Sequence, residues 1–338
     1  MNIFAVIPAH NEAKSIGATV RSLYAQTVKP THILVVCDNC TDNTAEEAAR
    51  AGAGTLTTKD NHHRKAGALN QALPVAMKSL SDVFLIMDAD TVLVPTWIED
   101  AARELEDRRV GGVGAVFAAD RQDSYLTYCQ SLEWARYAEE IDRTKKTFVL
   151  SGTAALIRRD ALNMVRAEFG RYYDVNSITE DFRMTVDLTL TGWELRSPNV
   201  CRSITETMPT VATLFRQRRR WSLGAMQTVA QAGFTRPIWP YIKQQLMIPL
   251  GILCMALYLL LSVSYAVAGV WALSPFWLAV GLIFVLERVI TVWHLGWKAR
   301  VFAALIVPEL AYALILQAAH VAAMLQFMAG SKGTWSHI

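Results

Sequence analysis

A stretch without any charged residue, Leu246–Leu273, does most to limit the folds open to this chain of 338 residues. An α-helix needs about 20 apolar residues to cross a bilayer, so this stretch predicts a transmembrane helix. Two more apolar segments, Phe276–Trp297 and Val301–Met328, contain charged or ionisable residues. They predict either spans whose charges face a protein interior or helices at the membrane interface. Three spans would place the C-terminus outside, and two would return it to the cytosol.

Hydrophobic residues make up 52% and charged residues 19% of the whole chain. The excess of apolar residues lies almost entirely after Tyr241. The formal net charge of +3 is too small to predict a nucleic-acid partner. The N-terminus lacks the basic and long apolar segments of a signal peptide, so we expect a head that stays in the cytosol at the inner membrane. We expect a catalytic head at residues 1–210 and an interfacial helical region at 211–243. A membrane region with two to three transmembrane helices is expected at 244–330, and a tail at 331–338.

Short apolar runs alternate with segments of helical periodicity in the head. Strands are expected at Asn2–Pro8, His32–Cys37, Thr55–Thr58, Val83–Met87, Val113–Phe117 and, as the last strand, Trp193–Pro198. Helices are expected at Lys14–Gln26, Thr44–Ala51, Gly67–Ser79, Ser124–Glu140 and Thr179–Leu190. This alternation predicts an α/β fold, Rossmann-like, with a parallel sheet and helices on both faces. Ligands bind such sheets at the carboxyl ends of the strands.

Two carboxylates, Asp88 and Asp90, directly follow the apolar run Val83–Met87. Carboxylate oxygens suit a hard divalent cation, which could bridge the phosphates of a nucleotide diphosphate. The competing interpretation is a strand end capped by solvated acids. The pattern favours a metal and diphosphate site at this strand end.

A second acidic site is Asp38, which follows the run His32–Cys37 and could accept a hydrogen bond from a nucleobase imide N–H. Pro8, Ala9 and Glu12 end the first strand beside it and could supply backbone groups and a carboxylate to the ribose. Lys65 lies just before the predicted helix Gly67–Ser79 and could approach phosphate, although a basic residue in a loop is usually only solvated. These residues form the predicted nucleotide site.

A pair of acids, Glu180 and Asp181, stands in the first turn of a predicted helix opened by Thr179. A positioned carboxylate can remove the proton from an acceptor hydroxyl as a new glycosidic bond forms. We assign this general-base role to Asp181, with Glu180 as the alternative base. Acids at a helix start can also simply complement the helix dipole.

A basic and aromatic motif precedes the apolar tail, in which Gln217, Arg220 and Trp221 have the i, i+3, i+4 spacing of one helix face. The guanidinium could pair with pyrophosphate and the indole could floor an acceptor-sugar site. The competing interpretation is an interfacial helix that contacts lipid headgroups.

These motifs together resemble the membrane-bound family 2 glycosyltransferases, which include cellulose, chitin, hyaluronan and poly-N-acetylglucosamine synthases and ceramide glucosyltransferases. The motifs that carry the resemblance occur in the family's order: Pro8–Glu12, Asp38, Asp88-Ala-Asp90, Thr179-Glu-Asp181 and Gln217-Arg-Arg-Arg-Trp221. The resemblance implies a GT-A fold with a mixed, mostly parallel sheet. It also implies a UDP-sugar donor, Mg2+ or Mn2+, and inversion to a β linkage.

Carried over by position, the resemblance assigns Asp38 and Asp88 to UDP, Asp90 to the metal and Asp181 to the base. It also assigns Gln217, Arg220 and Trp221 to pyrophosphate and acceptor. It places Ser151-Gly152-Thr153 in a loop near the acceptor.

The expected function is a membrane-anchored transferase acting on a carbohydrate or glycolipid acceptor, as a processive polysaccharide or oligosaccharide synthase. Single-sugar transfer to a membrane lipid is the alternative, and a non-catalytic carbohydrate-binding or transport protein is a further one. Polymer-secreting relatives carry transmembrane helices before the catalytic domain and this chain shows none, which leaves export open. A homo-oligomer is compatible with the sequence.

Overall fold

The computed structural model of the protein describes residues 1–145, 147–269 and 275–330. The expected tail, 331–338, lies outside the described residues, as does the end of the uncharged stretch, 270–273. The chain divides into two compact units, Met1–Thr207 and Met208–Ile338.

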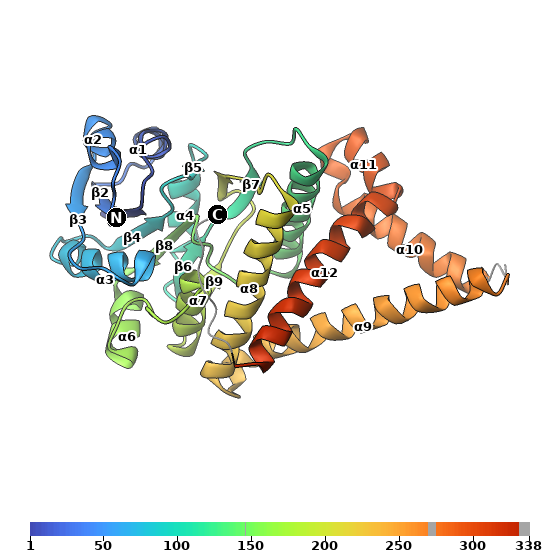
Figure 1. Cartoon of the computed structure of the whole chain (residues 1–338). Coiled ribbons are helices and arrows are strands. Elements are labelled where there is room, and N and C mark those ends of the chain that lie inside the picture. Colours follow the sequence, from blue (N-terminus) through green and yellow to red (C-terminus); the bar gives the residue numbers. More distant parts are fainter. Residues whose placement is uncertain (146, 270–274, 331–338) are drawn as a thin grey trace. The chain divides into compact units, whose positions relative to one another are not determined.

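The first unit is built on a seven-stranded sheet with the order β3-β2-β1-β4-β8-β6-β9 (Figure 1). Its strands are β1 Ile3–Ala9, β2 His32–Cys37, β3 Gly54–Thr57, β4 Val83–Met87, β6 Val110–Gly114, β8 Ala154–Arg158 and β9 Glu194–Arg196. Only β8 runs antiparallel to its neighbours β4 and β6, and the other pairs are parallel. The predicted mixed, mostly parallel α/β sheet is therefore confirmed.

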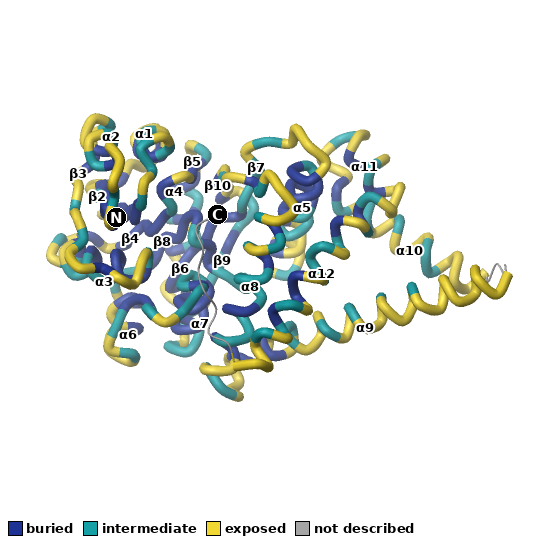
Figure 2. Tube along the Cα trace, in the orientation of Figure 1, coloured by how far each residue is buried: buried dark blue, intermediate teal, exposed yellow. Residues whose placement is uncertain are grey.

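Helices cover both faces of this sheet, and each face has its own hydrophobic core. The helices are α1 Ile16–Tyr24, α2 Thr44–Arg50, α3 Arg64–Ala76, α4 Trp97–Glu104, α6 Arg159–Phe169 and α7 Glu180–Leu190. A further helix, α5 Tyr125–Thr144, packs against the strand β7 Val116–Ala119. Alternate residues of β1 face opposite sides: Ile7 joins the core that contains Trp97, and Val6 joins the core that contains Leu69 and Met184. The alternation follows from the two-residue period of a strand. The buried sheet interior is dark blue in Figure 2.

A second sheet of three short strands, in the order β5-β10-β7, adds to the first unit. Its strands are β5 Val92–Leu93, β7 Val116–Ala119 and β10 Arg202–Thr205. Two sequence predictions were wrong here. The expected strand Val113–Phe117 is divided between β6 and β7, because Val113 pairs with Leu156 in the large sheet while Val116 pairs with Arg202 in the small one. The expected last strand is β9, but β10 follows it and pairs with β7.

The second unit is helical. It contains α8 Val211–Ala232, a 3-10 turn at Arg236–Ile238, α9 Trp239–Val267, α10 Pro275–Thr291, a 3-10 turn at Trp293–Leu295, α11 Trp297–Ala304 and α12 Val307–Met328. The expected continuous segment Val301–Met328 is broken between α11 and α12, where Ile306 has a φ of +55° and Pro308 enters the first turn of α12. Proline fits a first helical turn but cannot continue a preceding helix.

Two helical segments of the second unit, Arg236–Val267 and Val307–Met328, are long and apolar enough to cross a membrane. The mean hydropathy of the most apolar window is 2.4 in the first and 1.5 in the second. None of that window is buried in the first segment and 22% is buried in the second. The exposed surface of α9 is yellow along its length in Figure 2.

Candidate active site

The carboxyl ends of three adjacent strands, β2, β1 and β4, form the edge at which the predicted nucleotide residues gather. Pro8 and Ala9 end β1, Asp38 follows β2, and Asp88 follows β4. The backbone N–H of Asp38 donates to the carbonyl of Ala9 at 2.8 Å, which joins the first two strand ends. The parallel order therefore brings residues some 80 positions apart in the sequence to one edge.

The Asp38 carboxylate is buried and oriented by three donors that all reach Oδ1. They are Asn61 Nδ2 at 2.7 Å, Thr58 Oγ1 at 2.8 Å and Asn39 Nδ2 at 3.1 Å. Among the described residues, no donor contacts Oδ2. One carboxylate oxygen thus accepts all three of these hydrogen bonds.

Glu12 lies beyond the end of β1 and is half-buried. Its Oε2 accepts from Ser15 Oγ at 2.6 Å, and its backbone N–H donates to Thr44 Oγ1 at 2.8 Å. Burial raises the pKa of Glu12 and nearby Asp88 raises it further, against the hydrogen bond from Ser15. The side chain therefore belongs to the same acidic edge.

Lys65 stands between two carboxylates that the sequence separates widely. Its Nζ lies 2.5 Å from Asp88 Oδ1 and 3.1 Å from Glu180 Oε1. Burial alone lowers the pKa of Lys65, but Asp88, Glu180 and Asp181 together raise it well above its usual value, so the ammonium stays charged. Burial raises the pKa of Asp88 to about 6, although Lys65 opposes the rise. A cation and three acids thus make one coupled group.

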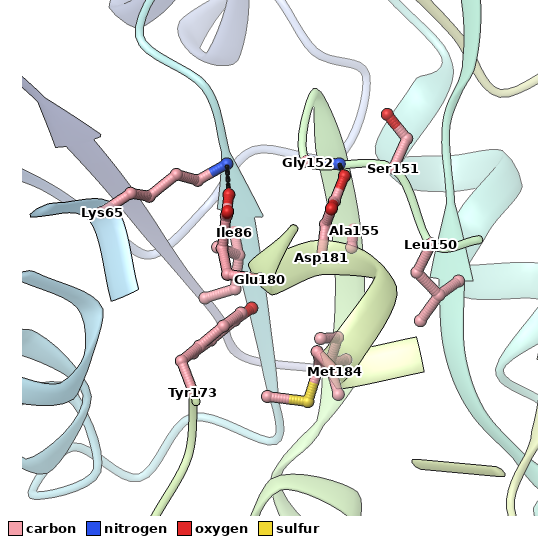
Figure 3. Close-up of a pocket in the computed structure, with 11 residues that line it drawn as sticks. Lys65, Ile86, Leu150, Ser151, Gly152, Ala155, Tyr173, Glu180, Asp181 and Met184 are labelled. Atoms are coloured by element: carbon pink, nitrogen blue, oxygen red, sulfur yellow. Dashed lines mark hydrogen bonds and ion pairs between the residues drawn. The ribbon is translucent and has the colours of Figure 1, made fainter. Parts of the chain in front are cut away.

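Asp181 lies in the first turn of α7, and both of its carboxylate oxygens accept backbone N–H groups. Gly152 donates to Oδ2 at 3.0 Å, and Phe182 donates to Oδ1 at 2.7 Å. Burial and the neighbouring Glu180 raise the pKa of Asp181, while Lys65 and the two amides lower it. Figure 3 shows Asp181 and Gly152 joined in this way, beside the pair Lys65–Glu180.

Gly152 lies where the charged groups converge. A Cβ added there would be 2.8 Å from Lys65 Nζ, 3.3 Å from Asp181 Oδ2 and 3.5 Å from Asp88 Oδ2. Behind it is a small pocket of about 10 Å³, close to the least space that one water molecule needs. Its lining combines Lys65, Glu180 and Asp181 with Tyr173 and apolar residues including Ile86 and Met184 (Figure 3).

The metal ligands expected at this edge are fewer than a protein cage would need. Asp90 is exposed, and its Oδ1 accepts from Thr91 Oγ1 at 3.2 Å. Within residues 1–145, 147–269 and 275–330, no three His, Cys, Asp or Glu side chains are grouped to hold a metal ion. Asp88 and Asp90 fit a hard cation that also binds phosphate oxygens and water, because such a cation needs only one or two protein carboxylates.

The residues Gln217, Arg220 and Trp221 lie on α8 and belong to the second unit. All three are half-buried, and the neighbouring Arg218 guanidinium stacks over Trp221, 4.4 Å from the ring centroid. Gln217 Oε1 is buried without a hydrogen-bond partner in the part of the chain that the structure describes. The helix begins at a capping box made by Thr210 and Thr213.

Sequence reasoning missed several residues of the first unit. Asn61 and Thr58 orient Asp38, and Tyr173 lines the pocket. A polar loop directly before the helix of Lys65 was the available signal for Asn61. Tyr173 gives no signal in the sequence, because its place depends on the packing of the segment between α6 and α7.

A sheet of this order with acidic residues at the ends of its central strands is the GT-A fold of nucleotide-sugar transferases. The mannosyltransferase PcManGT from Pyrobaculum calidifontis, solved in complex with GDP-Man and Mn2+, is similar in fold, with a TM-score of 0.62 and 18% identity. The similarity covers 97% of this chain and 87% of that one. Residues 4–165 match Glycosyl transferase family 2, and this chain carries a glycosyltransferase domain of that family.

Two curated relatives are bacterial polysaccharide synthases. The poly-beta-1,6-N-acetyl-D-glucosamine synthase of Staphylococcus aureus (strain COL) is 23% identical over 75% of this chain and 63% of its own length. The protein of the same name from Staphylococcus epidermidis is 25% identical over 70% of this chain and 57% of its own length. The chain therefore spans less than two thirds of the relatives it matches.

Proposed function

We propose that this protein transfers a sugar from a UDP-sugar to a carbohydrate hydroxyl, with inversion to a β linkage, as a step in polysaccharide synthesis at a membrane. The observation that carries the proposal is the Asp181 carboxylate, held by the amides of Gly152 and Phe182 and coupled through Lys65 to Asp88 at the nucleotide edge. A single displacement requires a general base beside the diphosphate site.

In the proposed reaction the acceptor hydroxyl attacks the anomeric carbon on the face opposite the diphosphate. The bond from that carbon to the diphosphate oxygen breaks, UDP leaves, and the hydroxyl proton passes to Asp181. Asp88 and Asp90 would hold Mg2+ or Mn2+, which supplies charge neutralisation to the diphosphate when bound. Lys65 can move its ammonium from Asp88 toward a phosphate oxygen. Glu180, paired with Lys65 at 3.1 Å, would hold the ammonium within the site after it leaves Asp88.

The geometry of Asp38 supports uridine over guanosine as the donor base. Guanine presents two adjacent donors, N1–H and N2–H, and would use both oxygens of one carboxylate. At Asp38, Oδ1 already accepts three donors, so Oδ2 can serve one N–H, which is what the uracil imide offers. Pro8 and Ala9 would line the base and Glu12 would face the ribose.

The acceptor side of the proposal rests on the loop and the second unit. Ser151 and Gly152 would border the acceptor sugar beside the base, and Gln217, Arg220 and Trp221 would bind pyrophosphate and acceptor. The polysaccharide synthases among the relatives support a carbohydrate acceptor. The two apolar helices of the second unit support anchoring in a membrane. The proposal places that anchor in the cytoplasmic membrane, with the head in the cytosol.

The test is sugar transfer by the purified full chain in detergent or lipid nanodiscs. The protein is incubated with Mn2+ and UDP-N-acetylglucosamine, UDP-glucose, UDP-galactose or GDP-mannose, with and without short carbohydrate acceptors. We expect UDP release and a lengthened product by mass spectrometry with one UDP-sugar. Asp181→Asn should abolish transfer and keep UDP binding by calorimetry. Turnover of Asp181→Asn near the wild-type rate would show that the base is another residue, and a product formed only on lipid would refute the carbohydrate acceptor.

A further inference from the structure

The loop segment Leu150–Thr153 is bonded to both sides of the candidate site. On the base side, Leu150 N–H donates to Thr185 Oγ1 at 2.9 Å and Gly152 N–H donates to Asp181 Oδ2 at 3.0 Å. On the nucleotide side, Asp88 N–H donates to the carbonyl of Thr153 at 3.3 Å. The loop therefore links the strand that ends at Asp88 with the helix that carries Asp181.

Three buried hydroxyl groups hold this loop against the small sheet. Thr153 Oγ1 lies 2.7 Å from Ser151 Oγ and accepts from Ser203 Oγ on β10 at 3.0 Å. Thr153 N–H also donates to Ser151 Oγ at 3.1 Å. The exposed fractions are 0% for Ser203, 3% for Ser151 and 9% for Thr153. We call these three side chains the hydroxyl clip.

The clip encloses the residue that orients the base. Ser151 and Thr153 flank Gly152, so their mutual bonds fix the direction of the Gly152 N–H that points at Asp181. Buried hydroxyls without partners cost free energy, which means that removing the central one leaves both neighbours to rearrange. Loss of the Thr153 hydroxyl therefore frees the loop to turn its amide away from the carboxylate.

We propose that Thr153 is a positioning residue for sugar transfer, acting through the hydroxyl clip on the Gly152 amide and so on the Asp181 carboxylate. The proposal rests on the proposed function, because it assigns a task within the same reaction. Thr153 contacts no reacting atom in the proposed reaction. Its contribution is to hold the base in line with the acceptor hydroxyl and to keep one charge-stabilising hydrogen bond on that base.

The experiment compares Thr153→Val, which keeps the shape and loses the hydroxyl, with Thr153→Ser, which keeps the hydroxyl. We expect kcat of Thr153→Val to fall about ten-fold or more, because small displacements of a catalytic group are costly, with UDP affinity within about two-fold of wild type. The acid limb of its kcat–pH profile should move to higher pH, since the lost amide bond normally lowers the pKa of Asp181. Thr153→Ser should restore both rate and profile.

Two further variants keep the test decisive. Thr189→Val removes a hydroxyl that bonds Thr185 O within α7 and touches neither loop nor base, and it should retain wild-type kcat. Ser203→Ala removes the clip bond from β10 and gives the test if Thr153→Val does not fold, and it should shift the pH profile in the same direction. If the wild-type protein transfers sugar and the clip variants keep its kcat and pH profile, the positioning role of Thr153 is overturned while the proposed function stands. A wild-type protein that transfers no sugar would refute the proposed function.

Discussion

Lys65 Nζ lies 2.5 Å from Asp88 Oδ1 and so joins the helix α3 to the end of strand β4. The same ammonium contacts Glu180 on α7 at 3.1 Å, which brings the nucleotide edge and the proposed base into one electrostatic group. A change of charge at one member of this group should therefore shift the pKa of the others. The predictions below measure that coupling, its dependence on the space at Gly152, and the structural support around it.

The pH dependence of the wild-type enzyme should show the environment of Asp181. The base must be ionised, and burial and Glu180 raise its pKa above that of an ordinary aspartate. Activity should therefore be lost as pH falls through this raised pKa, on an acid limb at higher pH than an exposed aspartate would give. The measurement is kcat against pH under donor saturation. A profile flat down to the pKa of an unperturbed aspartate would contradict the assignment.

Lys65→Met should move that acid limb to still higher pH. The positive charge of Lys65 lowers the pKa of Asp181, so its removal raises the pKa and the base becomes protonated sooner as pH falls. Donor KM should also rise, because the diphosphate loses a cation. Arg103→Met is the control: that arginine pairs with Glu99 and Asp100 on the exposed face of α4, and its loss should leave both quantities unchanged.

Gly152→Ala should lower activity strongly with little loss of stability. The new Cβ would meet Lys65 Nζ at 2.8 Å, so the ammonium must leave its place between Asp88 and Glu180, and a flexible lysine can do this at small conformational cost. We expect kcat/KM to fall by about ten-fold or more while the melting temperature changes little. Gly17→Ala is a matched control, since the nearest atoms to its Cβ belong to the Arg21 guanidinium, at 3.1 Å. Full activity in Gly152→Ala would show that the space is not needed.

Asp38→Ala should weaken UDP binding and leave the proposed general base, Asp181, unchanged. A hydrogen bond to a charged group contributes about 1.5–3 kcal/mol, which corresponds to about a ten- to hundred-fold loss of affinity. Calorimetric titration of UDP into the variant measures it, with Glu46→Ala on the exposed side of α2 as the control. Equal UDP affinity in wild type and Asp38→Ala would remove Asp38 from the nucleotide site.

Asp187→Ala should destabilise the first unit. Its carboxylate is fully buried and accepts from Arg171 Nη1 at 2.8 Å and Arg183 Nε at 2.9 Å. Truncating one partner of a buried ion pair costs about 3–5 kcal/mol, because the other charges lose their counterion. Thermal unfolding of the full chain should show a clearly lower transition. Asp142→Ala, which breaks an exposed pair with Lys145, should change the transition little.

Much of the first unit could be predicted because its strands are local patterns. The run Val83–Met87 is apolar throughout and is followed by an acid, so both the strand and its end were readable from the sequence. The division at Ala115 was not readable, since it depends on β10, whose Arg202–Thr205 lies more than 80 residues away. A strand of four residues with a distant partner leaves no period to detect.

The site was predictable in its carboxylates and less so in its connections. Asp38, Asp88 and Asp181 follow strand ends or open a helix, so local sequence signals their positions, and their roles stay predictions. The contact of Lys65 with Glu180 crosses more than 110 residues, and only the folded sheet brings them together. The hydroxyl clip is invisible in sequence for the same reason, because Ser203 reaches Thr153 from a different sheet.

The exposed surface of α9 has a consequence for handling the protein. A helix whose most apolar window has no buried residue would present that window to water once lipid is removed. Such molecules would adhere to one another through these helices, and the loss of the soluble monomer would then mimic inactivation. Rates measured in plain buffer would therefore reflect aggregation of the protein. Extraction into detergent micelles keeps the protein dispersed, so that its concentration can be measured.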